Sequence, residues 1–252
     1  MRNVLWSLVF VLFAVGICSA QSVSYLPQFV VGTQAGGISW STVIAVTNPA
    51  GLGTPPASGT ITLTNDDGTP LNWSFTDENF HPIGSTFQLA GGQTAFFLSP
   101  VFIGDGPLLI SGFATVTSNL PVTSSAVLSE SGPHGAIGEA GVPAATPLTS
   151  QGTVIVKTDQ ENTGIAVANP GTGAAMLTFQ LLDNSGAPIG PQVTRTLAAN
   201  NHTAFFVTDL FPSAPSKVFG TLRIISSQPI VSTALFFRAD GTFATVPTFP
   251  LQ

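Results

Sequence analysis

Charged side chains are scarce in this chain of 252 residues, which holds only 6 Lys and Arg and 12 Asp and Glu. They make up 7% of the sequence, where an ordinary soluble domain has about 25%. A nucleic-acid partner is excluded, because phosphates need clustered Lys and Arg and the net charge here is −6. The scarcity of periodic Ala, Glu, Lys and Leu excludes a coiled coil or a helical bundle.

Cysteine is almost absent, and the one cysteine, Cys18, lies in a segment with the features of a secretory signal peptide. Arg2 supplies a short basic start, residues 4–17 form an almost unbroken apolar run, and small residues fill the cleavage positions before Gln21. We therefore expect residues 1–20 to be removed on export and the mature chain to begin at Gln21.

The mature chain has neither a cysteine nor a second long apolar run. Bulky Ile17 precedes Cys18 where a lipoprotein signal carries a small residue, so the sequence favours cleavage over a lipid anchor. No later stretch reaches about 18 uninterrupted apolar residues, so no membrane span is expected in the mature chain. The predicted location is extracellular or on the cell surface, with the periplasm as the alternative, and packing must replace disulfides.

Hydroxyl and apolar residues dominate what is present. The sequence has 30 Thr and 23 Ser, and its 44% apolar content is too high for a disordered chain. Apolar and polar residues alternate over 110–117 and again over 122–128, which is typical of half-buried strands, and we predict that the two runs form a hairpin. Turn signals recur about every 8–12 residues, so the predicted fold class is all-β, built from antiparallel β-sandwiches.

An internal repeat divides the mature chain into two copies of one module. Four blocks recur in the same order, which is the signature of tandem modules. The sequence predicts two β-sandwich domains, at 21–146 and 152–252, joined by a linker at 147–151 that lacks periodicity. The matching blocks are 44–49 with 165–170, 94–97 with 203–206, 112–128 with 220–236, and 142–143 with 246–247.

The alternation also predicts where the individual strands lie. One helical turn is predicted at 209–211, with Asp209 as its N-cap and Pro212 after it. Further strands are predicted at 25–32, 39–48, 59–64, 71–76, 86–89, 93–98 and 136–143 in the first copy, and at 152–157, 163–169, 175–182, 192–197, 203–208 and 242–247 in the second.

Several short runs carry a resemblance to a protein family. They are Trp-Ser-Thr at 40–42, Thr-Asn-Pro at 47–49, Asn-Asp-Asp-Gly at 65–68, Glu-Ala-Gly-Val-Pro at 139–143 and His-Thr-Ala-Phe-Phe at 202–206. With these runs the chain resembles uncharacterised secreted bacterial proteins that carry tandem Ig-like β-sandwich modules. The resemblance covers nearly the whole mature chain. It implies an Ig-like fold and export, and it leaves the function open.

One loop brings two carboxylates and an imidazole together in sequence: Glu130, His134 and Glu139 lie within ten residues. A zinc site would need a second His or a Cys nearby, and the mature chain has no Cys. The alternative is a hairpin loop whose charged side chains face water, and we favour it.

Two other clusters also have simpler structural explanations. The run at 65–68 lacks the spacing of a calcium loop, and its counterpart at 183–186 keeps one carboxylate, so both predict hairpin turns. His202 and Asp209 do not come with a nucleophile elbow, so a catalytic pair is disfavoured and His202 is predicted to be structural. We therefore expect no enzyme activity, no metal and no cofactor.

The two copies differ in charge. Residues 21–150 contain seven acidic residues and no Lys or Arg, whereas residues 151–252 contain five of each sign. The surface of the first module should attract cations or neutral hydroxyl-bearing ligands and repel polyanions. The alternative is compositional drift without functional consequence.

The first copy also has an extra segment, predicted as a hairpin around residues 71–80. Aromatic rings can stack on sugar C–H surfaces while carboxylates accept hydrogen bonds from hydroxyl groups, so this segment is a candidate ligand platform. The alternative is that its apolar residues alternate with polar ones and simply face the core. The candidate ligand-binding residues are Trp73, Phe75, Asp77, Glu78 and Phe80.

Three function classes remain open. The leading prediction is a secreted, non-catalytic structural or adhesive protein of the cell surface or the extracellular space. The alternative is a protein that binds a polysaccharide or another surface protein through the hairpin of the first domain. A two-domain pilus chaperone is disfavoured, because such a chaperone holds its client's carboxylate with basic residues and the first module has none.

Overall fold

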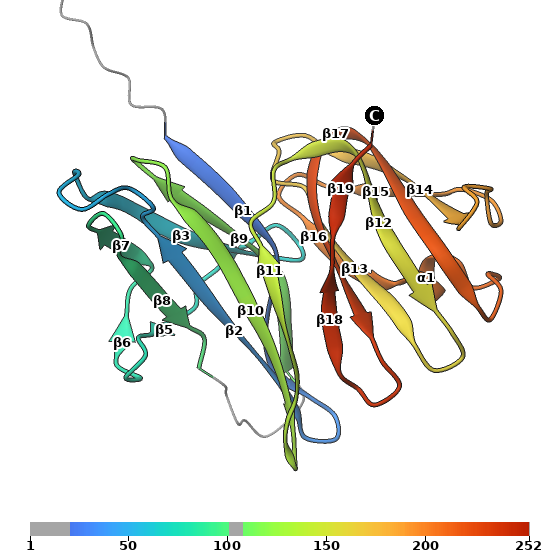
Figure 1. Ribbon diagram of the computed structural model, residues 1–252, viewed down its shortest axis with the longest axis horizontal. Helices are drawn as coiled ribbons and strands as arrows, with labels where there is room; N and C mark the ends of the chain where they lie inside the picture. Colours follow the sequence, from blue (N-terminus) through green and yellow to red (C-terminus); the bar gives the residue numbers. More distant parts are fainter. Residues whose placement is uncertain (1–20, 101–107, 252) are drawn as a thin grey trace, which may run out of the picture.

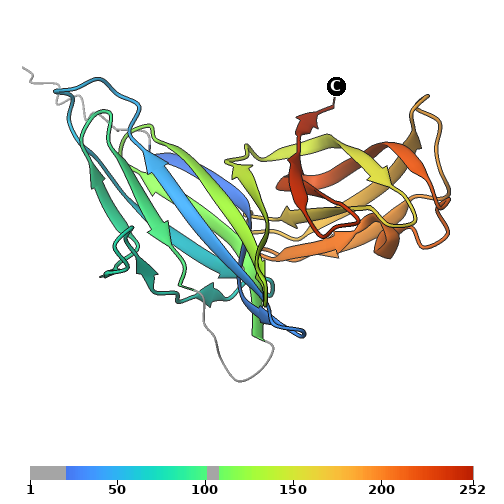
Figure 2. The same cartoon turned by 60° about the horizontal axis from the view of Figure 1, so that its bottom comes forward.

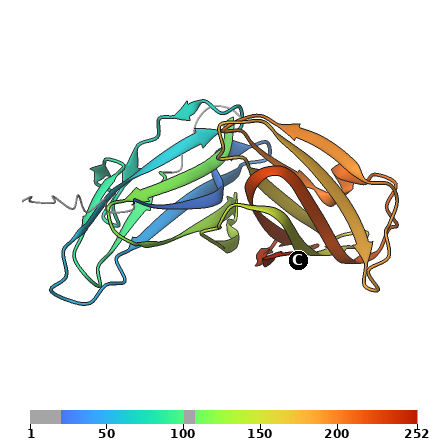
Figure 3. The same ribbon diagram turned by 90° about the horizontal axis from the view of Figure 1, so that it is seen from above.

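The computed structural model describes residues 21–100 and 108–251, and these are almost entirely β-strand (Figure 1). The strands form two sandwiches that lie side by side (Figures 2 and 3). The predicted all-β sandwich fold is thereby confirmed. Within the described ranges, no helix has the length and apolar character needed to cross a membrane. The predicted signal peptide at 1–20 lies outside these ranges.

The first sandwich has two layers joined by the hairpin between its first two strands. One layer has the order β4-β3-β9-β1, with β7 also paired to β3, and the other has the order β11-β10-β2-β8-β5-β6. The strands are β1 (Ser22–Gln34), β2 (Ile38–Thr47), β3 (Ala57–Asn65), β4 (Pro70–Leu71), β5 (Phe75–Thr76), β6 (Pro82–Ile83), β7 (Thr86–Leu89), β8 (Thr94–Leu98), β9 (Leu108–Ser118), β10 (Thr123–Gly132) and β11 (Gly135–Pro143).

The second sandwich repeats this plan with a shared strand. One layer has the order β15-β14-β17-β12-β19 and the other the order β16-β13-β17-β18. The helix α1 (Val207–Leu210) follows β16. The strands are β12 (Leu148–Lys157), β13 (Asn162–Ala168), β14 (Ala175–Asp183), β15 (Val193–Leu197), β16 (His202–Phe206), β17 (Val218–Phe237), β18 (Phe243–Val246) and β19 (Thr248–Pro250).

The hairpin predicted for the runs 110–117 and 122–128 is wrong, and the equivalent residues 218–236 of the second copy do not form one either. In the first copy β9 pairs with β1 and β3, whereas β10 pairs with β2 and β11 in the opposite layer. In the second copy the whole segment is the single strand β17, which passes from one layer to the other. Both halves bury their alternate apolar residues in the same core from opposite sides, so the chain crosses between layers instead of folding back.

Three smaller predictions also need correction. The strand predicted at 71–76 is split, because Leu71 pairs with β3 while β5 pairs with β6 and β8, so the extra hairpin spans 75–83 instead of 71–80. The predicted linker at 147–151 lies largely in β12, which begins at Leu148. The helical turn is 207–210, and Asp209 is its third residue, accepting a hydrogen bond from the Phe206 N–H at 2.8 Å.

Each sandwich encloses an apolar core formed by alternate residues of its strands. Phe29, Ile44 and Phe97 are at the centre of the first core, and Phe179 and Leu222 are at the centre of the second. Leu235 and Phe243 of the second sandwich pack against the first core, so the two sandwiches are in apolar contact. Independent folding of 21–146 and 152–252 stays a prediction.

Candidate functional site: the groove between the two sandwiches

The sandwiches meet through the outer faces of two layers. Strands β1 and β9 of the first sandwich lie against β13, β16 and the second half of β17. Phe113, which points outward from β9, packs on Ala168 and Val231 and is only 2% exposed. Tyr25 and Ala145 flank this contact. An outward-facing Phe is therefore buried here because the second sandwich covers it.

A row of aromatic rings continues the contact at one end. The rings of Trp40 and Phe243 lie 5.2 Å apart between centroids, across the boundary between the sandwiches. Phe237 follows at 5.3 Å from Phe243, and Phe206 at 5.2 Å from Phe237. A Cβ at Gly138 would lie 3.0 Å from the Phe243 ring, so the close approach of β11 to β18 leaves little room for a side chain there.

A polar contact closes the other end. Asp66, in the turn after β3, accepts a hydrogen bond from Nδ1 of His202, the first residue of β16, at 2.7 Å. Ser111 donates to the same carboxylate, and the backbone N–H of His202 donates to the Asp66 carbonyl at 3.1 Å. The His202 side chain is 0% exposed, and that of Asp66 is 55% exposed.

The electrostatics of Asp66 reflect this contact. Partial burial raises the pKa of Asp66, but the hydrogen bonds from His202 and Ser111 and the charge on His202 outweigh it, so the pKa lies below the usual 3.8. A carboxyl group with a lowered pKa in the folded state contributes stability above its unfolded pKa and loses it as the pH falls through the folded value. The contact should therefore stabilise the protein at neutral pH and fail in acid.

This contact predicts a pH-dependent difference between the wild type and Asp66→Asn. The variant should be less stable at neutral pH, and the difference in free energy of unfolding should shrink as the pH falls below 3.8. Urea titrations at successive pH values measure it. The other carboxylates titrate in both proteins, so their contributions cancel in the difference between the two free energies of unfolding. If that difference does not change with pH, the role given to Asp66 is contradicted.

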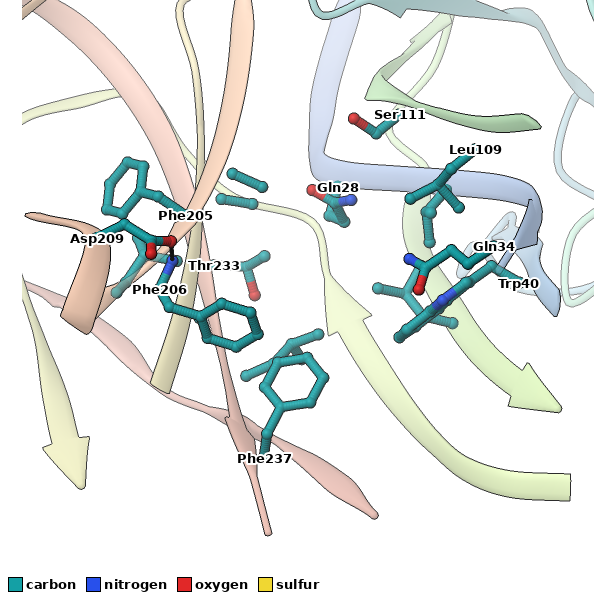
Figure 4. Close-up of a pocket in the computed structure, with 17 residues that line it drawn as sticks. Gln28, Gln34, Trp40, Leu109, Ser111, Phe205, Phe206, Asp209, Thr233 and Phe237 are labelled. Carbon is teal, nitrogen blue, oxygen red and sulfur yellow. Dashed lines mark hydrogen bonds between the residues drawn. The ribbon is translucent and has the colours of Figure 1, made fainter. Parts of the chain in front are cut away.

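Between the aromatic row and the polar contact the sandwiches diverge and leave a groove of about 420 Å³ (Figure 4). Its walls are mainly apolar or aromatic, with Phe206 and Phe237 facing Gln28 and Trp40 across the gap. The polar side chains that line it are Gln28, Gln34, Ser111, Asp209 and Thr233.

Two polar atoms of the groove residues are buried without a partner. Among the described residues, Gln28 Oε1 and Trp40 Nε1 have no hydrogen bond, and both residues are 8% exposed. An unpaired buried donor or acceptor costs about 1–3 kcal/mol, so a bound group that supplied the missing partner would recover that energy. The groove thus combines aromatic walls with one free acceptor and one free donor, which suits a neutral ligand with apolar faces and hydroxyl groups.

The residues predicted as a ligand platform do not form one surface. Phe75 is 1% exposed and packs edge to face on Phe97 in the first core. Trp73 is half-buried and contacts the edge of Phe29. Only the hairpin tip is open to solvent, with Phe80 75% exposed and Glu78 beside it. The ligand-binding role of the segment stays a prediction that rests on this tip.

Asp77 shapes the tip. Its carboxylate accepts hydrogen bonds from the backbone N–H groups of Asn79 and His81 and lies 3.3 Å from the His81 ring. The N–H of His81 is the largest of the influences that lower the pKa of Asp77. Phe80 then adopts a positive φ of 62°. Asp77 is therefore occupied in holding the turn that exposes Phe80.

The other sequence candidates do not assemble into a catalytic or metal site. Burial raises the pKa of Glu130, and Glu139 accepts a hydrogen bond from Ser129. Throughout the described ranges, no three His, Cys, Asp or Glu side chains lie close enough to hold a metal ion. His202 pairs with Asp66 and not with Asp209, a contact that the sequence reasoning missed.

The comparisons with known proteins are distant. No protein-family model matches the chain, and no curated protein matches it. Among solved structures it is similar to the major pilin subunit of Bacillus cereus, with 13% identity over 92% of this chain and a TM-score of 0.24. It is also similar to a glycosyl hydrolase family 2 member from Bacteroides cellulosilyticus, with 12% identity over 87% of this chain and a TM-score of 0.18. The chain spans 66% and 29% of those two chains, less than two thirds of either.

Proposed function

We propose that the protein is a secreted, non-catalytic structural or adhesive component of the cell surface or the extracellular space. The observation that carries this is the way the two sandwiches are fixed to each other. Phe113 is buried between their faces, Trp40 packs against Phe243, and Asp66 binds His202. A chain that serves as a spacer or scaffold needs such a fixed geometry between its modules, because a flexible linker would let them move independently.

The composition supports the same proposal. Thr and Ser are abundant while Lys and Arg are few, so much of the surface is neutral and rich in hydroxyl groups. The antiparallel layers and the buried contact between the sandwiches supply stability without any cysteine in the mature chain. A surface component without disulfides must keep its fold outside the cell by packing of this kind.

Fractionation of the source cells tests the proposal. An antibody against the chain should detect it on the cell surface or in the medium, with Gln21 as its N-terminal residue. Deletion of the gene should reduce adhesion of the cells to a solid surface, and a restored copy should recover it. A chain that stays in the cytoplasm with Met1 in place, or a deletion strain that adheres normally, contradicts the proposal.

A second candidate is a protein that binds a carbohydrate or a partner protein. The unpaired atoms of Gln28 and Trp40 in the groove favour it, because they offer an acceptor and a donor beside aromatic walls. The exposed Phe80 at the hairpin tip is a further contact point for such a ligand. In the adhesion experiment, competition by an added neutral polysaccharide favours this candidate over a purely structural component.

A further inference from the structure

The two sandwiches have equivalent strands, so each has two equivalent outer faces. Strands β12, β14 and the first half of β17 correspond to β1, β3 and β9, because the pairings are the same. Strands β13, β16 and the second half of β17 correspond to β2, β8 and β10. The internal interface uses one face of each kind, namely β1 and β9 against β13 and β16. Among the described residues, no sandwich covers the two remaining faces.

The uncovered face of the second sandwich is apolar, and we name it the β12–β17 face. Phe219 on this face is 57% exposed. The face also has a hollow of about 500 Å³, lined in part by Val154, Leu182 and Phe249. Several large exposed apolar side chains in one place are unusual on a monomer and indicate a contact surface. The exposed apolar residues of the face are Val154, Met176, Phe219, Ile225 and Phe249.

The uncovered face of the first sandwich resembles the β13 and β16 face of the second sandwich, which contacts β1 and β9 in the internal interface. We name it the β2–β8 face; β2 and β8 are labelled in Figure 1. The receiving face inside the molecule presents small residues and one exposed aromatic, Ala166, Ala204 and Phe206. The β2–β8 face likewise presents Ala45 and Phe96, and Phe96 is 45% exposed.

The polar contact of the internal interface also has a counterpart on the uncovered faces. Asp66 in the run 65–68 corresponds to Asn184 in the run 183–186. His202 pairs with Ala168, and Thr94 pairs with the equivalent residue Thr47, so His202 corresponds to Thr94. This structural correspondence is shifted by one residue from the sequence alignment of the repeats, which places Thr94 opposite Thr203. The carboxylate–imidazole pair would be replaced by an amide and a hydroxyl, which are again a matched hydrogen-bonding pair.

The distribution of charge also favours contact between the two uncovered faces. The first module holds seven acidic residues and no Lys or Arg between 21 and 150, whereas the second module holds every Lys and Arg of the mature chain. Arg223 projects from the β12–β17 face, and its Nε is buried without a partner in the described structure. Contact between the two uncovered faces would bring this cation to the acidic module.

We propose that a second copy of this chain covers the β12–β17 face with its own β2–β8 face, repeating the internal interface. Because the two surfaces differ, the contact is head to tail, and each added copy leaves one face of each kind free for the next copy. This inference rests on the proposed structural function and names its partner. Asn184 of one copy then lies beside Thr94 of the next.

Engineered thiols test this placement, because Cys18 is the only native cysteine. The full precursor, with Cys18→Ser, is exported and purified as two variants, Thr94→Cys and Asn184→Cys, which are mixed with a short bis-maleimide cross-linker. A cross-linked heterodimer is expected, and a chain with both substitutions should give a ladder of multimers. Thr62→Cys is the matched control, since Thr62 is exposed on the opposite layer of the first sandwich.

Sedimentation gives an independent measurement. The exported chain should associate as its concentration rises, and Phe219→Asp should weaken that association at least about tenfold, because a charge replaces the most exposed apolar ring of the β12–β17 face. Leu108→Asp, at a more exposed apolar residue in β9, on the opposite layer of the first sandwich and outside both faces, should leave it unchanged.

A monomer at every concentration, or cross-linking no greater than with Thr62→Cys, overturns the inference. These results would leave the proposed function intact if the chain is found at the cell surface and the deletion strain loses adhesion. Conversely, a chain that assembles in vitro but stays in the cytoplasm contradicts the proposed function and not the interface.

Discussion

Replacing Trp73 with Ala should lower the free energy of unfolding by about 3 kcal/mol. The indole packs on the first core, with its ring 6.5 Å from that of Phe29 in an edge-to-face arrangement. Truncation removes this contact and leaves a cavity beside Phe29 that the neighbouring strands can only partly fill. Since Trp73 is half-buried, the loss should fall at the lower end of the range for large aromatic residues. Urea denaturation followed by circular dichroism measures it.

Phe80→Ala provides the matched control in the same segment. Phe80 is on the hairpin tip and is mostly exposed, so its truncation should change stability by no more than about 0.5 kcal/mol. The ordering of the two variants decides what the extra segment does. If Trp73→Ala is as mild as Phe80→Ala, the indole does not support the core and the ligand-platform hypothesis gains ground over the packing one.

The strands and the repeat were predictable because their signals are local. In residues 175–182 every second side chain is apolar, and Leu177, Phe179 and Leu181 are all fully buried in the second core. Turn residues such as Gly186, with a positive φ of 84°, mark where a strand must end. Alternation and turn chemistry depend on neighbours in sequence, so they can be read without knowing the tertiary structure.

The layer that a strand joins was not predictable in the same way. The alternation across 112–128 fits a hairpin and a crossover equally well, because both put the same side chains in the core. Only the pairing of β9 with β1 and of β10 with β2 decides between them. These pairings join residues 75 to 96 positions apart, and no local signal encodes them.

The contacts between the sandwiches were missed for a related reason. Asp66 lies in a turn, so the local pattern already explained it, and its partner His202 is 136 positions away. The one available signal was the difference between the copies: Asp66 stands where the second copy has Asn184. An ionisable pair that has neutral residues at the equivalent positions of the other copy is a useful indication of an interface between repeats.

Phe113 gives the sharpest test of that interface. Phe113→Ala should lower the free energy of unfolding by about 3–5 kcal/mol, because the side chain is almost fully buried between the sandwiches and its loss leaves a cavity against Ala168 and Val231. The two sandwiches should also unfold less cooperatively, since the contact that couples them is weakened. Differential scanning calorimetry should then resolve two transitions where the wild type shows one.

Thr221 occupies the position of Phe113 in the second copy and makes the comparison specific. Thr221 lies on the β12–β17 face. The second sandwich covers Phe113, but no sandwich of the described chain covers this face. Thr221→Ala should therefore leave stability within about 0.5 kcal/mol and keep a single transition in dilute solution. If both variants behave alike, Phe113 does not couple the two sandwiches. The proposed structural function then loses the main contact on which the fixed geometry was argued. If only Phe113→Ala separates the transitions, the buried Phe is the residue that makes two repeated modules into one mechanical unit.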